Sequence, residues 1–404
     1  MSGGVKGVAA LVAIVGLALL ARTFGGARAF WDREPSAEPE APVLQPVAPD
    51  DEQAPEVEER TSVDTHAPQA PADVGVVWSE LNEEAIAALE AGNLELAVQL
   101  FEECLAAVPK EVVFANNLAE ALARLARAQR DSGEFELEVP IATLQRAVDL
   151  APQREDLARL LERWKKEAQT EEEFWTDETA HFLLSYDGER QELLKTGYLD
   201  VTRQLEEVYD EFGLAFNHYP VGHGDPKIRV VLYKRDEFSQ VTGVGHWAGG
   251  VYDGVVRVPV GDYSSERQVL ERVLRHELVH AFVRSYGGRE VPGWLNEGLA
   301  QWLEAQPGTR ALEVQSARGK LTQATLFSLE ELQGSFAGWS DESRITRAYA
   351  QSLAFVDFLV TWYGEHVVFE LVRACGEGEA PAKSFAAKTA RQLDATLVDF
   401  REEL

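Results

Sequence analysis

The chain has 404 residues, of which 45% are hydrophobic, so it is long enough for two folded domains with further segments beside them. It carries 38 basic and 68 acidic side chains, and the formal net charge of -30 disfavours binding to nucleic acid or to anionic lipid surfaces. The two cysteines, Cys104 and Cys375, form no CxxC pair, which argues against a disulfide framework and indicates small buried side chains. Because of the negative net charge, we expect no nucleic-acid partner.

Residues 1–30 hold an apolar run from Gly7 to Ala21 that follows Lys6. The run is somewhat shorter than the roughly 20 residues that span a bilayer, so it fits a short membrane anchor or a signal peptide. A small-x-small pattern at 27–29 favours cleavage, whereas Arg22 and Arg28 follow the run more closely than is typical of a signal peptide. Basic residues on both sides of the run leave its orientation weakly determined. We expect an uncleaved anchor with the bulk of the chain outside the cytoplasm, and the alternative is secretion after signal cleavage.

Residues 31–75 are dense in proline, alanine and acidic residues and contain few large apolar side chains. Such a composition cannot bury enough apolar surface to offset the entropy lost on ordering. It predicts a disordered linker, and much of the negative charge lies there, so this charge need not indicate a partner.

Residues 76–170 are predicted to form pairs of helices. The first pair, in residues 81–109, has a turn at Gly92 and Asn93 and a second helix with an apolar stripe, and Pro109 ends that helix. A helix, a tight turn and a second helix form one unit that cannot bury its apolar face alone. Stacked copies are therefore expected.

A looser copy of this helix pair follows and ends at Pro152, with Pro140 where its second helix should begin. A third helix from Arg154 to about Ala168 would close the stack. The pattern resembles tetratricopeptide repeats and implies an all-α stack of helical hairpins over about ninety residues. Such a stack either binds a peptide or a protein partner on its concave face or serves as a rigid spacer.

Residues 173–404 change character and predict an α+β domain. Residues 180–188 and 227–235 run apolar with aromatic and β-branched side chains, which predicts strands, and a helix near 198–212 separates them. Residues 245–260 predict a hairpin or an edge strand, with glycines in the turns. An exposed edge can pair with an extended peptide through main-chain hydrogen bonds.

Residues 269–285 have helical periodicity and contain the sequence RHELVHAFV. On such a helix His276 and His280 lie one turn apart on one face, so both imidazoles can reach the same ion. Glu277, about 100° around the helix, can stand beside that ion without binding it. By itself, the five-residue pattern is a moderate signal for a metal site.

A second helix with the sequence VPGWLNEGLAQWLE, residues 291–304, strengthens this interpretation. Its Glu297 comes 17 residues after His280, close enough to return as a third ligand. Two histidines and one glutamate with an open fourth position are the ligands of a hydrolytic zinc site rather than of a closed structural one.

The combination of HELVH and WLNEGLA resembles the gluzincin branch of zinc metalloproteases, the peptidase MA-like proteins. The resemblance implies a zincin-like α+β fold, with a mixed sheet and an active-site helix. It also implies Zn2+ held by His276, His280 and Glu297, with Glu277 as the catalytic base. Zinc would lower the pKa of its bound water to around 7 and polarise a peptide carbonyl, while Glu277 moves the water proton to the leaving amine.

Two departures bear on the substrate. The spacing to Glu297 is a little shorter than in aminopeptidases that share the WLNEG phrase, and GHWAGGVYDG stands where their GxMEN motif would be. The glutamate of that motif holds a free substrate amine, so its absence favours an endopeptidase.

A group that stabilises the oxyanion is expected in residues 347–364, which resemble the downstream helix of peptidase MA-like proteins. Tyr349 is the candidate there, with Tyr363 and Tyr252 as weaker alternatives. Gln301, one turn after Glu297, either hydrogen-bonds a ligand histidine or faces solvent. Asn296 is expected to orient the helix of Glu297.

These features predict a membrane-tethered zinc metallopeptidase that acts on protein or peptide substrates, with a repeat domain that positions them. The alternative is a repeat-based interaction scaffold whose protease-like domain binds metal but is inactive or weakly active. The intact Glu277 favours the enzyme.

Overall fold

The structure, a computed structural model, describes residues 74–132, 135–187, 198–222, 226–242, 249–261, 263–336, 339 and 341–404. The proposed membrane segment at 7–21 and nearly all of the acid-rich linker lie outside the described residues. Within the described part, no helix has the length and apolar character needed to cross a membrane. Contacts divide the chain into two units, one ending at Ala168 and the other running from Gln169 to Leu404.

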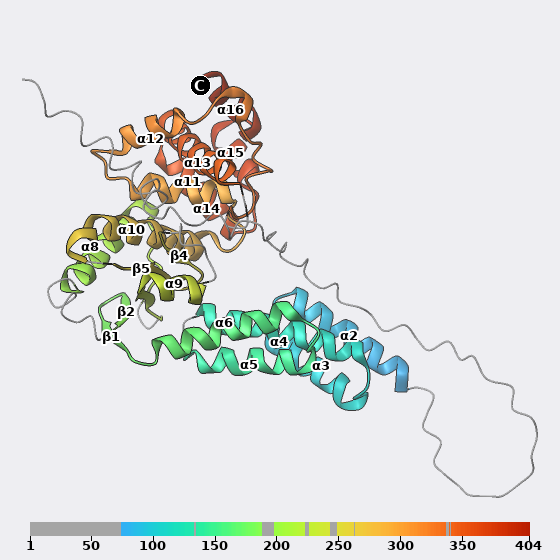
Figure 1. The fold of residues 1–404 in the computed structure, drawn as a ribbon. Coiled ribbons are helices and arrows are strands. Elements are labelled where there is room, and N and C mark those ends of the chain that lie inside the picture. The colour runs from blue at the N-terminus through green and yellow to red at the C-terminus, as the bar shows by residue number, and fades with distance from the viewer. Residues whose placement is uncertain are drawn as a thin grey trace, which may run out of the picture. The chain divides into compact units, whose positions relative to one another are not determined.

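The first unit is helical in its described part, and its first four helices pack on their neighbours in sequence (Figure 1). The helices are α2 (Val74–Glu90), α3 (Leu94–Ala107), α4 (Val112–Ser132), α5 (Glu138–Leu150) and α6 (Glu155–Glu171). The turn expected between the first two helices is confirmed, with Gly92 at a φ of 80°, which glycine adopts without strain. Pro140 lies in the first turn of α5, where its missing N–H costs nothing.

Two polar pairs cross the interior of this helical unit. The Arg130 guanidinium donates to the Glu167 carboxylate at 2.7 Å and joins α4 to α6, and both side chains are buried. The side chain of Asn117 donates to that of Asn82 at 3.0 Å and joins α4 to α2. These pairs satisfy polar groups inside a core made largely of alanine and leucine.

The second unit contains a mixed five-stranded sheet in the order β1-β2-β3-β5-β4. The strands are β1 (Phe174–Glu178), β2 (Phe182–Asp187), β3 (Ile228–Tyr233), β4 (Val251–Tyr252) and β5 (Val256–Pro259). The three central strands are parallel, and the outer pairs β1/β2 and β4/β5 are antiparallel. The two expected strands and the hairpin are confirmed, whereas β1 was not anticipated.

Helices cover both faces of this sheet. Along β3 the side chains alternate: Val230 and Leu232 face the large core with α8 (Tyr198–Phe216) and α10 (Tyr263–Gly287), while Val231 faces α9 (Arg235–Thr242). This alternation follows from the two-residue period of a strand. Figure 1 shows α10 lying along the sheet beside α8.

The rest of the unit is helical and continues the large core. Its elements are α11 (Gly293–Glu304), α12 (Arg310–Arg318), the 3-10 turn η2 (Gln323–Thr325), α13 (Glu342–Tyr363), α14 (Glu365–Gly376), α15 (Pro381–Thr389) and α16 (Leu393–Glu402). Of these, α11 and α13 were expected. They pack closely at Gly298, where a Cβ atom would collide with the main chain of Ser352. This contact fixes the helix of Glu297 against the helix of Tyr349.

Candidate metal centre

Helix α10 presents the histidine pair because its apolar residues anchor it to the core. Its buried side chains include Leu270, Leu274, Leu278 and Phe282, which recur at helical spacing. The face between this apolar stripe and solvent carries His276 and His280, both partly buried. The helix is 25 residues long, longer than the sequence pattern indicated.

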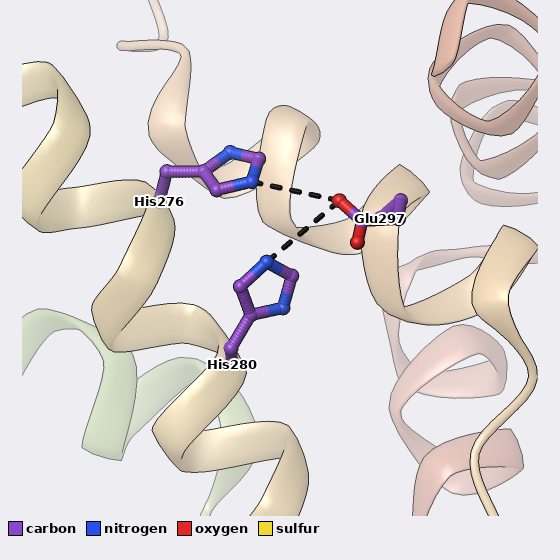
Figure 2. A group of neighbouring side chains, drawn as sticks. All are labelled: His276, His280 and Glu297. Carbon is purple, nitrogen blue, oxygen red and sulfur yellow. Dashed lines mark ion pairs between the residues drawn. The ribbon is translucent and has the colours of Figure 1, made fainter. Parts of the chain in front are cut away.

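His276, His280 and Glu297 converge on one point (Figure 2). The Nε2 atoms of His276 and His280 lie 3.6 Å and 3.7 Å from the same oxygen, Oε2 of Glu297. The ligand atoms that the three residues offer are all within 4.8 Å of one another. Ligand atoms about 2.0–2.1 Å from a tetrahedral zinc ion are roughly 3.4 Å apart, so the separations suit a shared ion.

Each imidazole is oriented by a hydrogen bond on its other nitrogen. Nδ1 of His276 lies 2.8 Å from Oε2 of Glu304, and Nδ1 of His280 lies 2.9 Å from Oδ1 of Asn296. Since these oxygens accept, both Nδ1 atoms donate, and the lone pair of each Nε2 points toward Glu297. Glu304 is also paired with Arg272, which keeps its carboxylate in place.

The three facing atoms have the chemistry of a cation site. Oε2 of Glu297 is buried and has no hydrogen-bond partner among the described residues. Burial lowers the pKa of His276, but the nearby carboxylates of Glu297 and Glu304 outweigh burial and raise that pKa well above its usual value. Burial lowers the pKa of His280. A proton on His276 or a cation is needed to offset the facing acceptors, and two imidazoles with one carboxylate fit zinc.

Glu277 is 6% exposed and lies beside this cluster. Burial raises the pKa of its carboxyl to about 8, and the nearby Glu297 and Glu304 add to this, while His276 opposes it. A bound cation would lower this pKa again. Among the described residues none donates a hydrogen bond to the Glu277 carboxylate, so the group is available to accept a proton.

Tyr349 lies on α13, within range of the charges of the same cluster. Burial raises the pKa of its phenol, and the charges of Glu297 and Glu277 raise it further, so the hydroxyl keeps its proton. Its ring packs edge-on against Phe336, with centroids 5.4 Å apart. Tyr349 can therefore serve as a donor beside the metal ligands.

The two alternative tyrosines have other surroundings. The ring of Tyr363 packs against Phe385 at 5.0 Å. Tyr252 lies on β4, and burial raises its pKa to about 12, with Arg284 acting in the opposite direction. For Tyr349, by contrast, the charges of both Glu297 and Glu277 raise the pKa.

Three polar residues near the candidate ligands make hydrogen bonds that the sequence did not predict. Gln301 does not bond a histidine; its amide donates to the main-chain oxygens of Glu297 at 3.1 Å and Tyr349 at 3.0 Å. Asn296 bonds His280 directly. Glu304, which bonds His276, was not anticipated, although its position two turns after Glu297 places both on one helix face.

Residues 229–398 match the model of the Peptidase MA superfamily. The matched segment begins in β3 and includes α10, α11 and α13, which carry the clustered residues. No curated protein matches the chain. This match supports a peptidase MA-like, and thus metallopeptidase-like, domain in residues 229–398, and the matched superfamily is typically metal-dependent.

Proposed function

We propose that this protein is a zinc-dependent metallopeptidase of the gluzincin type. The observation that carries the proposal is the convergence of His276 and His280 on one buried carboxylate oxygen of Glu297, to which no described residue donates a hydrogen bond. The hydrogen bonds on both Nδ1 atoms support it, because oriented ligand histidines are typical of metal sites.

The surrounding residues supply the acid and base chemistry. When bound, zinc provides a Lewis acid and lowers the pKa of a water molecule to about 7. Glu277 accepts the proton of the attacking water and passes it to the amine that leaves. The protonated hydroxyl of Tyr349 donates a hydrogen bond to the oxygen on which negative charge develops.

The substrate is proposed to be an internal peptide bond of an extended chain. β4 is an edge strand of the sheet, and it contacts α10, the helix that carries the histidines. Its outer edge therefore suits pairing with an extended peptide. The absence of a GxMEN motif removes the glutamate that would hold a free amino terminus, which favours cleavage within a chain.

The N-terminal half has two proposed roles. The run at 7–21 would tether the protein to a membrane, with the folded units outside the cytoplasm, or direct secretion if it is cleaved. The helices α2 to α6 would form tetratricopeptide-like repeats that hold a substrate or protein partner, or a spacer. The helix pairs and the turn at Gly92 support this proposal.

The test combines metal analysis with digestion of an unfolded protein mixture by the purified full-length chain. We expect about one zinc ion per chain for the wild type and for Glu277→Gln, with cleavage reduced by about 10²-fold or more in the variant. Glu271→Gln, a change on the same helix outside the metal centre, is the matched control and should cleave like the wild type.

Three outcomes would contradict parts of this proposal. Equal activity of wild type and Glu277→Gln would exclude Glu277 as the base. Retention of zinc by His276→Ala would exclude the ligand assignment. Zinc binding without cleavage by the wild type would favour the alternative, a repeat-based scaffold with an inactive metal-binding domain.

A further inference from the structure

The orientation of Glu277 requires an explanation. A general base must lie within hydrogen-bond reach of the proton that it takes, so its carboxylate has to be held in one place. Among the described residues, no donor holds that carboxylate. Its orientation must therefore come from packing, and its neighbours decide where it can lie.

One of these neighbours is a main-chain segment without a side chain. A Cβ atom built on Gly250 would lie 2.8 Å from both Cγ and Oε1 of Glu277, and 2.9 Å from Cγ1 of Val273. Separations under 3.0 Å are essentially never found for real Cβ atoms. The main chain just before β4 thus lies so close to Glu277 that there is no room for a side chain at position 250.

The adjacent glycine provides a contrast. Among the described residues, a Cβ atom on Gly249 would meet only Cγ2 of Val273, at 3.2 Å, which a shift of a few tenths of an ångström relieves. Neither Gly249 nor Gly250 has a positive φ, so alanine fits the backbone at both positions. Substitutions at the two sites differ in whether the new methyl group meets Glu277.

We propose that the main chain at Gly250 is a positioning element for Glu277, and that glycine is required there because any side chain would displace the carboxylate. The role in catalysis rests on the proposed peptidase function. The steric contact between position 250 and Glu277 does not, so the two can be tested separately.

The steric test uses thermal unfolding of the full-length chain with Gly250→Ala and Gly249→Ala, each in the wild-type and the Glu277→Ala background. We expect Gly250→Ala to lower the melting temperature clearly in the wild type and less so when Glu277 is truncated, because part of the clash is then removed. The small effect of Gly249→Ala should be the same in both backgrounds.

An equal loss for Gly250→Ala in both backgrounds would overturn the proposal. If Gly250→Ala alone does not fold, folding of the double variant supports the proposal, and failure of both overturns it. These readouts need no enzymatic activity, so they remain valid if the wild type proves to be inactive.

The catalytic test uses kinetics on a peptide substrate. Gly250→Ala should bind one zinc ion per chain as the wild type does, because it leaves His276, His280 and Glu297 untouched. Its kcat should fall between about tenfold and 100-fold, with KM unchanged, since the base is misplaced rather than the substrate. Gly249→Ala should keep the kcat of the wild type. An unchanged kcat in a folded, zinc-loaded Gly250→Ala would show that this residue does not determine the position of the Glu277 carboxylate.

Discussion

The side-chain amide of Gln301 donates a hydrogen bond to the main-chain oxygen of Tyr349 at 3.0 Å, and a second one to the main-chain oxygen of Glu297 at 3.1 Å. One amide group thus joins the helix that carries the candidate metal ligand Glu297 to the helix that carries the proposed oxyanion donor. The close packing at Gly298 reinforces this joint. The distance between Glu297 and Tyr349 is therefore set by α11 and α13 together.

Replacing Gln301 with leucine should loosen this joint while leaving the metal ligands intact. Leucine has a similar volume but cannot donate, so two hydrogen bonds are lost, at a cost of about 1–2 kcal/mol in unfolding free energy. We expect zinc content to stay near one per chain and kcat to fall by roughly tenfold, because Tyr349 is less well placed. Zinc analysis and peptide kinetics measure both effects, and loss of zinc would contradict the expectation.

Replacing Tyr349 with phenylalanine removes only the hydroxyl. If this group donates to the developing oxyanion, kcat should fall by about 10²-fold, with KM and zinc content unchanged. Tyr363→Phe is the matched control, because its ring packs on Phe385 and it should keep normal activity. Equal kcat for Tyr349→Phe and wild type would mean that another group stabilises the oxyanion.

Glu304→Gln should weaken zinc binding. The carboxylate accepts the Nδ1 proton of His276, and loss of such a partner lowers metal affinity by about 10-fold to 100-fold. Competition with a chelator measures the affinity. Glu313→Gln is the control, since it removes the other carboxylate bound by Arg272 without touching His276. Similar affinities for the two variants would show that Glu304 does not support the metal ligand.

Glu167→Ala should destabilise the helical unit. It removes the buried carboxylate to which the buried Arg130 guanidinium donates, a change that costs about 3–5 kcal/mol. Hydrogen exchange of peptides from α4 and α6 reports on this unit separately from the rest of the chain. Arg159→Ala, in the exposed pair with Glu155, should cost less than about 1 kcal/mol. Unchanged exchange in Glu167→Ala would mean that the buried pair contributes little.

The main elements around the site follow from local patterns. The helical spacing of Leu274 and Leu278 predicts α10, and the four-residue spacing of His276 and His280 places them on one face. The parallel strands and the hairpin follow from alternation and glycine positions. The strand β1 was not predicted because its side chains are mostly exposed, so its sequence has only a weak apolar pattern.

The outer hydrogen bonds of the site were harder to predict. Gln301 is one turn from Glu297, so spacing allowed it to reach a histidine, yet the neighbouring helix α13 offers its carbonyl instead. Glu304 is two turns away and still reaches His276, because α10 and α11 pack side by side. The hydrogen-bond partner of a polar side chain on a helix therefore depends on the neighbouring helix that packs against it.

The sequence by itself determined the three candidate ligands and the candidate base, because residues spaced along one helix or on two neighbouring helices have predictable directions. Only the tertiary structure decided that Glu304 and Asn296 bond the histidines, that Tyr349 on α13 lies within range of the charge of Glu277, and that the main chain at Gly250 lies against the side chain of Glu277. These contacts join segments far apart in the chain, and their distances arise from packing that no local pattern encodes.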